Sequence, residues 1–96
     1  MAIRLIVTIT AAPGRGSELA DLYKARCAAV MREPGCEQFE VFQSVMNSDK
    51  VVLLERWTDR GVLDAQAKLN STRPPLPSEL RTGTTVREDY DDSRTR

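Results

Sequence analysis

The sequence predicts a single α+β domain whose elements follow the order β-α-β-β-α-β. Four segments show the period-two alternation or the apolar, β-branched enrichment of strands: residues 3–10, 36–45, 50–57 and 84–90. Two further segments, from about residue 16 to 32 and from about 59 to 70, place apolar side chains at helical spacing. This order is the ferredoxin-like arrangement, in which both helices cover one face of a four-stranded antiparallel sheet.

The first strand and the first helix have recognisable patterns and ends. Strand 3–10 alternates two sets of side chains: Ile3, Leu5, Val7 and Ile9 against Arg4, Ile6, Thr8 and Thr10. The helix presents one continuous apolar stripe: Leu19, Leu22, Tyr23, Cys27, Val30 and Met31. Ser17 is its predicted N-cap, because a serine oxygen accepts a hydrogen bond from the free N–H groups of a first turn. Pro34 and Gly35 end the helix after Arg32.

The next two strands are joined by a turn at residues 46–49. Strand 36–45 alternates Glu37, Phe39, Val41 and Gln43 against Gln38, Glu40, Phe42 and Ser44. Strand 50–57 is the most apolar, with Val51 and Leu53 on one face and Val52 and Leu54 on the other. We therefore expect it to be central and covered on both faces.

The second helix is capped by Thr58 or Asp59 and carries a weaker stripe: Val62, Leu63, Ala65 and Leu69. Prolines at positions 74, 75 and 77 exclude a continuous helix through residues 70–83, although 78–81 can form a single helical turn. The last strand places Val86 and Tyr90 on one face. Residues 1–91 are the predicted domain and 92–96 a polar tail.

Composition excludes several classes of function. The 96 residues contain no histidine, so a Ser-His-Asp triad, a Cys-His pair, a histidine-ligated iron and an HExxH zinc site are all excluded. Fourteen basic and fourteen acidic side chains give a formal net charge of zero, which predicts neither a nucleic-acid partner nor an anionic membrane partner. The two cysteines are too few for a disulfide framework and are expected to be reduced thiols.

The apolar patterning also predicts a location and an oligomeric state. The longest apolar runs are strand-sized, well short of the roughly 20 residues of a membrane-spanning helix. The first ten residues lack the features of a secretory signal, so we expect the protein in the cytoplasm. One face of the predicted sheet has no helix to cover it, and the simplest cover is a second copy packed sheet to sheet.

Several segments, in order, resemble the antibiotic biosynthesis monooxygenase family of dimeric α/β barrel proteins. The matching pieces are a turn before the first helix (Ala12-Pro13-Gly14), a turn leading into a strand (Glu33-Pro34-Gly35-Cys36, then 37–42), and a strand running into a helix (53–57, then Asp59-Arg60 and Leu63-Asp64-Ala65). The resemblance covers residues 3–70 well and the last strand loosely. It implies a homodimer with a small apolar cavity.

The resemblance also implies cofactor-free oxygenation of a small aromatic, such as an anthrone or a quinol. In such members the substrate itself reduces dioxygen, while the protein stabilises a deprotonated, electron-rich ring and shields it from water. No cofactor and no metal are then expected. The tryptophan and histidine of the haem-degrading branch fall near Gln66 and Leu76, so haem binding is not expected. Of three residues typical of the anthrone-oxygenase branch, Trp57 is retained, while Leu53 and Leu63 replace an asparagine and a tyrosine.

These patterns select candidate site residues. Trp57 and Glu55, on one strand face with Leu53, are the predicted catalytic residues: Trp57 as a cavity wall donating to a substrate carbonyl, Glu55 as a base for a phenolic proton. The predicted pocket residues are Leu53, Tyr23, Cys27, Met31, Phe42 and Leu63. The alternatives are a core Trp57 whose N–H is bound by backbone, and a Glu55 paired with Arg4 or Arg87.

Three functions remain open from the sequence. The first is the cofactor-independent monooxygenase. The second is a dimer that binds a small ligand without turnover, favoured by the departures at Leu53, Leu63 and Gln66. The third is an isomerase or cyclase on the same scaffold that uses Glu55 as its base.

Overall fold

The computed structural model describes residues 2–73 and 76–91 and confirms the predicted order of elements. The strands and helices are β1 (Ile3–Thr10), α1 (Gly16–Val30), β2 (Cys36–Gln43), β3 (Lys50–Trp57), α2 (Arg60–Asn70), the 3-10 turn η1 (Ser78–Leu80) and β4 (Val86–Asp91). Residues 74, 75 and 92–96, which include two of the prolines and the predicted polar tail, lie outside the described part. No helix of the described part is long and apolar enough to cross a membrane.

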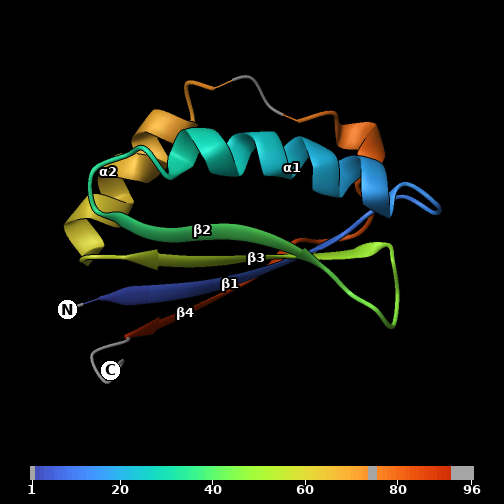
Figure 1. The fold of residues 1–96 in the computed structure, drawn as a ribbon, viewed down its shortest axis with the longest axis horizontal. Coiled ribbons are helices and arrows are strands. Elements are labelled where there is room, and N and C mark those ends of the chain that lie inside the picture. The colour runs from blue at the N-terminus through green and yellow to red at the C-terminus, as the bar shows by residue number, and fades with distance from the viewer. Residues whose placement is uncertain (1, 74–75, 92–96) are drawn as a thin grey trace.

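The four strands form one antiparallel sheet in the order β2-β3-β1-β4, with α1 and α2 on the same face (Figure 1). The two most apolar strands, β1 and β3, are central, as their patterns predict. In β1, Val7 pairs with Leu53 of β3 on one side and with Arg87 of β4 on the other. This is the ferredoxin-like fold.

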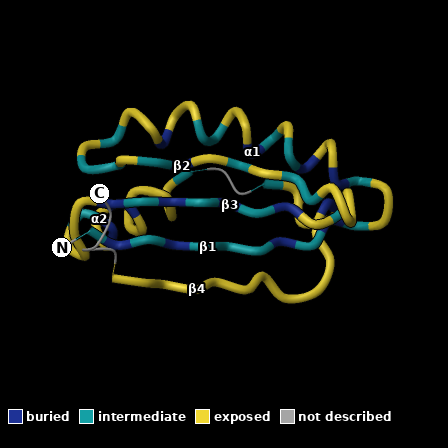
Figure 2. Tube along the Cα trace, turned by 60° about the horizontal axis from the view of Figure 1, so that its bottom comes forward, coloured by how far each residue is buried: buried dark blue, intermediate teal, exposed yellow. Residues whose placement is uncertain are grey.

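The core lies between the sheet and the helices, and it is built from one side of each central strand. Ile3, Leu5 and Ile9 of β1 are buried, and so are Val51 and Trp57 of β3. The alternate residues of β1 and β3 point to the outer face and are half-buried, apart from the exposed Lys50, while β4 is exposed along its whole length (Figure 2). The prediction that strand 50–57 is covered on both faces is therefore wrong for the single chain, because both helices lie on one side.

The start of α1 differs from the prediction. Ser17 lies inside the helix and is not its cap. The Asp49 side chain, from the β2–β3 connection, caps the helix start instead: its carboxylate accepts from the backbone N–H of Gly14 at 3.0 Å and of Gly16 at 3.1 Å. A Cβ at position 16 would lie 1.8 Å from the Ser48 carbonyl oxygen, so this approach requires glycine. The helix ends at Val30, two residues before the predicted end, in a turn that leads to Gly35.

Strand β2 contains a register shift that the alternating pattern does not reveal. Cys36 pairs with Trp57, and Gln38 pairs with Arg56, so Glu37 is an extra residue. Glu37 therefore turns toward Arg56, which donates to its carboxylate at 2.6 Å, and not toward the Phe39 face as predicted. The strand ends at Gln43, two residues earlier than expected.

Helix α2 has the predicted cap but a different buried face. Asp59 accepts from the Val62 N–H at 2.8 Å. The buried residues are Leu63 and Gln66, whereas Ala65 and Leu69 are exposed. At about 100° per residue, Ala65 and Leu69 lie on the far side of the helix from Leu63. The apolar stripe predicted for this helix is therefore wrong in two of its four members.

Candidate functional site

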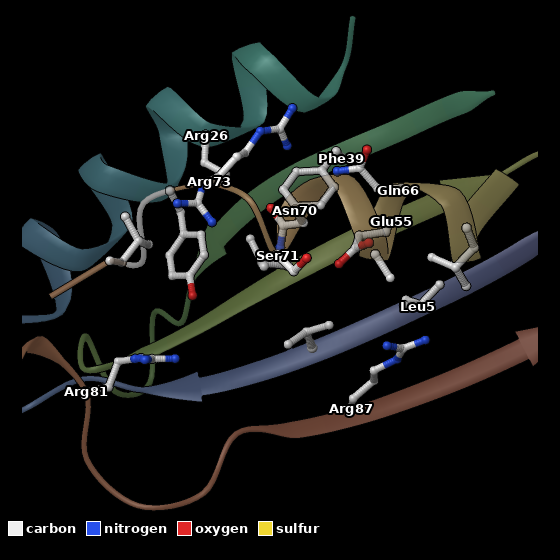
Figure 3. Close-up of a pocket in the computed structure, with 16 residues that line it drawn as sticks. Leu5, Arg26, Phe39, Glu55, Gln66, Asn70, Ser71, Arg73, Arg81 and Arg87 are labelled. Atoms are coloured by element: carbon white, nitrogen blue, oxygen red, sulfur yellow. The ribbon is translucent and has the colours of Figure 1, made fainter. Parts of the chain in front are cut away.

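A cavity of about 550 Å³ lies between the inner face of the sheet and the two helices. The sheet contributes Leu5, Val7, Phe39, Leu53, Glu55 and Arg87; α1 contributes Tyr23 and Arg26; α2 contributes Leu63, Gln66, Ala67 and Asn70; and the following segment contributes Ser71, Arg73, Leu76 and Arg81. The volume is in the range of small-molecule sites in proteins. The sheet side is mainly apolar, and most of the polar groups lie on the surrounding walls (Figure 3).

Glu55 is the acidic group of the described cavity lining. It follows Leu53 by two positions on β3, so both side chains point toward the helices, and it is 8% exposed. Burial raises the pKa of Glu55 above the ordinary carboxyl value. The hydrogen bond from Trp57 and the positive charge of Arg87 oppose that rise, while Asp89 adds to it. The net effect is a carboxyl group that holds its proton more strongly than an exposed one.

Trp57 is not placed as a wall of the cavity. Its side chain is fully buried in the core and is not among the lining residues. Its indole Nε1–H donates to Glu55 Oε1 at 3.1 Å. The N–H is thus used neither by a substrate carbonyl nor by the backbone, the two possibilities considered from the sequence. The geometry makes Trp57 a residue that holds the Glu55 carboxylate in place.

The predicted arginine partners of Glu55 have other hydrogen-bond partners. Arg4 lies on the outer face, where its guanidinium donates to the Gln38 side chain. Arg87 is on the inner face and lines the cavity, but its Nε and Nη2 donate to Asp89, at 2.8 and 3.1 Å. Arg87 therefore acts on Glu55 through its charge, and Arg4 is excluded as a partner by the alternation of the strand.

The structure brings together half of the predicted pocket residues. Tyr23, Leu53 and Leu63 line the cavity, whereas Cys27, Met31 and Phe42 do not. Phe42 pairs with Val52 on the outer face and is 47% exposed. Met31 follows the end of α1 and is 46% exposed.

The two cysteines are free thiols packed at the edge of the core. Cys36 Sγ lies 3.9 Å from Met31 Sδ. Burial raises the pKa of both thiols, that of Cys36 to about 11. A protonated thiol is a poor nucleophile, in agreement with the expectation that both cysteines act as small apolar residues.

Sequence reasoning missed most of the polar walls. Gln66 shares the buried face of α2 with Leu63, three residues earlier, and that spacing could have identified it. Arg73 and Arg81 follow α2 in an irregular segment without a local pattern. Arg81 lies beside Tyr23, where its charge and hydrogen bond oppose the increase in the Tyr23 pKa that burial causes. Arg73 and Arg81 reach the cavity only because the segment after α2 folds back over it.

Comparison with known proteins gives a family and a fold. The family model described as antibiotic biosynthesis monooxygenase matches residues 2–70. A crystal structure of a Pseudomonas aeruginosa protein is similar at 27% identity and a TM-score of 0.77, covering 93% of this chain and 91% of that one. A conserved protein from Methanosarcina mazei is similar at 25% identity and a TM-score of 0.77, covering 94% and 91%.

A further crystal structure, described as an antibiotic biosynthesis monooxygenase, is 19% identical with a TM-score of 0.76 and covers 94% of this chain and 97% of that one. At that identity the similarity supports the fold alone. No curated protein sequence matches the chain.

Proposed function

The chain belongs to the antibiotic biosynthesis monooxygenase family, and on that premise we propose that it oxygenates a small anthrone- or quinol-like aromatic with dioxygen and without a cofactor. The observation that carries the proposal is Glu55, a buried carboxyl of raised pKa at the base of a cavity of suitable size. General-base catalysis requires such a group within reach of the substrate proton.

The proposed reaction needs only dioxygen besides the substrate. Ionised Glu55 removes a proton from an activated C–H or O–H of the ring, and the resulting anion transfers one electron to dioxygen. The radical pair combines through a new C–O bond, and the proton returned by Glu55 gives a hydroperoxide. For a CH₂ carbon, loss of water from the hydroperoxide breaks the O–O bond and leaves a ketone, so that CH₂ and O₂ become C=O and H₂O.

The surrounding residues support this role for Glu55. Trp57 fixes the carboxylate through its N–H at 3.1 Å, which is a positioning role, since the indole itself is enclosed in the core. Tyr23, Phe39 and Leu63 provide apolar surface against which a flat ring can pack. Arg87 adds positive charge near the anion that proton removal creates.

Oxygen uptake with a panel of anthrones and quinols tests the proposal. Glu55→Gln keeps the shape but removes the base, and we expect kcat/KM to fall by about 10²- to 10⁴-fold. The matched control is Glu79→Gln, an exposed carboxyl on η1 outside the cavity lining. Absence of uptake across the panel, or equal rates in wild type and Glu55→Gln, would contradict the proposal.

The same buried carboxyl also favours the isomerase or cyclase alternative. A carboxylate that lines a cavity, such as Glu55, can move a proton within one substrate without dioxygen. Exchange of the acidic substrate proton into heavy water under anaerobic conditions, lost in Glu55→Gln, would favour that alternative if oxygen uptake is absent. Ligand binding with neither exchange nor uptake would favour the non-catalytic dimer.

We also propose a homodimer packed through the outer face of the sheet. The face carries Ile6, Val52 and Leu54 at its centre, half-buried in the single chain, with exposed Phe42 toward one edge and Val86 and Tyr90 toward the other. Contiguous apolar surface of this kind is typical of an interface. Light scattering is expected to give a dimer at micromolar concentration and a monomer for Phe42→Lys. The control Val45→Lys changes an exposed apolar residue of the β2–β3 connection and should stay dimeric.

A further inference from the structure

The cavity collects positive charge from a chain whose formal net charge is zero. Four arginines line it: Arg26 from α1, Arg73 and Arg81 from the segment between α2 and β4, and Arg87 from β4. Within the described lining, Glu55 is the only acidic residue, while Arg73 and Arg87 are also paired with Glu33 and Asp89 outside it. Arg81 and the N–H groups that Arg73 does not direct to Glu33 therefore supply the positive charge that favours a negatively charged ligand in this low-dielectric space.

Two buried polar atoms in the lining have no hydrogen-bond partner within residues 2–73 and 76–91. One is Arg73 Nη1, a donor, and the other is Gln66 Oε1, an acceptor. Arg73 is not free to turn away, because its Nη2 donates to Glu33 Oε1 at 2.6 Å and both side chains are largely buried. Gln66 is itself 8% exposed and is held on the inward face of α2. Buried polar groups are normally satisfied, and both atoms are covered in the ligand-free chain, so a ligand pairs with them by displacing the atoms that cover them.

We propose that the cavity binds an aromatic carboxylate that also carries a ring hydroxyl. The carboxylate accepts from Arg73 Nη1, with Arg81 adding charge at the cavity edge, and the hydroxyl donates to Gln66 Oε1. Because Nη2 is held by Glu33, Nη1 supplies one charge-assisted hydrogen bond to the carboxylate. The inference rests on the proposed function in taking this cavity as the substrate site, and it adds the charge and substituents of the substrate.

The position of Glu55 agrees with this orientation. Figure 3 shows Arg73 near α1 and Glu55 on β3, at separate places in the cavity. An anchored carboxylate therefore need not lie against the Glu55 carboxylate, which would repel it. Tyr23 and Phe39 line the space and offer aromatic faces for the ring. A volume of about 550 Å³ accommodates a ring system of two or three fused rings.

Calorimetric titration under anaerobic conditions tests binding apart from turnover. The probes are 6-hydroxy-2-naphthoate, its methyl ester, and 2-naphthoate, which lacks the hydroxyl. We expect the hydroxynaphthoate to bind about tenfold or more tightly than the ester, since the ester offers Arg73 a neutral acceptor in place of a charged one. Its affinity should fall as salt is added.

Variants assign the preference to residues. Arg73→Gln should remove the preference for carboxylate over ester, and Gln66→Met should remove the preference for the hydroxylated acid over 2-naphthoate. Arg81→Gln changes an exposed side chain, so it keeps the test usable if Arg73→Gln does not fold, and it should weaken the carboxylate preference. Arg32→Gln, an exposed arginine outside the cavity, is the control and should bind like wild type.

The outcomes separate this inference from the proposed function. Equal affinity for acid and ester, no binding of any aromatic acid, or an unchanged carboxylate preference in both arginine variants would overturn the inference. Tight, arginine-dependent binding without oxygen uptake by any probe would uphold it while the proposed oxygenase activity failed. Oxygen uptake with uncharged anthrones or quinols, combined with equal affinity for acid and ester, would uphold the activity and reject the anionic substrate.

Discussion

Replacing Trp57 by phenylalanine tests the central link in the site, the indole hydrogen bond to Glu55. The change keeps an aromatic ring in a fully buried position but removes the N–H that donates to Glu55 Oε1 at 3.1 Å. The carboxylate then stays buried with one hydrogen bond fewer. We expect both stability and catalytic activity to fall, since the same contact serves the core and the base.

The size of the loss follows from the burial of both partners. A hydrogen bond to a charged group contributes about 1.5–3 kcal/mol, and the packing defect left by the smaller ring adds about 1 kcal/mol. The free energy of unfolding should therefore fall by about 2.5–4 kcal/mol. For a domain of this size that corresponds to a decrease in Tm of about 10–30 °C. Urea unfolding at pH 7.5 measures the first quantity and calorimetry the second.

A double-mutant cycle isolates the hydrogen bond from the packing defect. In a Glu55→Leu background the indole has no carboxylate to bind, so Trp57→Phe should cost about 1.5–3 kcal/mol less than in wild type. An equal cost in the two backgrounds would refute the assigned role of the hydrogen bond, because the whole effect would then be packing.

The effect of Trp57→Phe should also depend on pH. The Trp57 hydrogen bond lowers the pKa of Glu55, so its loss raises that pKa further. The N–H favours the ionised carboxylate, so the destabilisation is largest above the folded-state pKa of Glu55 and shrinks as the pH falls through it. The acid limb of the kcat/KM profile should move to higher pH. A destabilisation independent of pH between 4 and 9 would argue against an ionised Glu55 as the acceptor.

Three further predictions concern stability and reactivity. Burial raises the pKa of Glu55, so the stability due to that residue is present in acid and is lost as pH rises through its folded-state pKa. Glu55→Gln should therefore be more stable than wild type in urea at pH 8 and equal to it in acid. The reverse order of stability would contradict this. Asp49→Ala removes the acceptor of the Gly14 and Gly16 N–H groups and should lower the free energy of unfolding by about 1 kcal/mol at an unchanged m-value; an unchanged midpoint would show that water replaces the cap. Cys36, whose pKa burial raises to about 11, should react slowly with maleimide at pH 7 in the folded protein and quickly in urea; rapid labelling of the folded form would refute that burial.

Much of the fold could be predicted because its strands and first helix carry strong local patterns. The alternation of Ile3, Leu5, Val7 and Ile9 identifies both β1 and the face it buries, and the same rule places Leu53 and Glu55 together on β3. The rule fails at β2, where the extra residue Glu37 breaks the alternation. A bulge depends on pairing with the neighbouring strand, so a single strand sequence does not reveal it.

The candidate site was predictable where one element supplies it. Glu55 and Leu53 come from a single strand, and Tyr23 from a helix stripe, and all three line the cavity. Phe42 is a predicted pocket residue that lies on the outer face, since alternation gives two faces without saying which one the helices cover. The partner of the Trp57 N–H could not be predicted either, because it depends on side-chain geometry between Trp57 and Glu55 on the same buried face.

The sequence by itself determined the order of elements, the central place of the two most apolar strands, the family, and the exclusion of histidine-based chemistry. Each of these depends on composition or on spacing within one segment. Only the tertiary structure brought Arg26, Arg73, Arg81 and Arg87 into one cavity with Glu55 and left two buried polar atoms without partners in the described part of the chain. The physical reason is that a cavity is made by contacts between segments far apart in the chain, and hydrophobic periodicity carries no information about which segments meet.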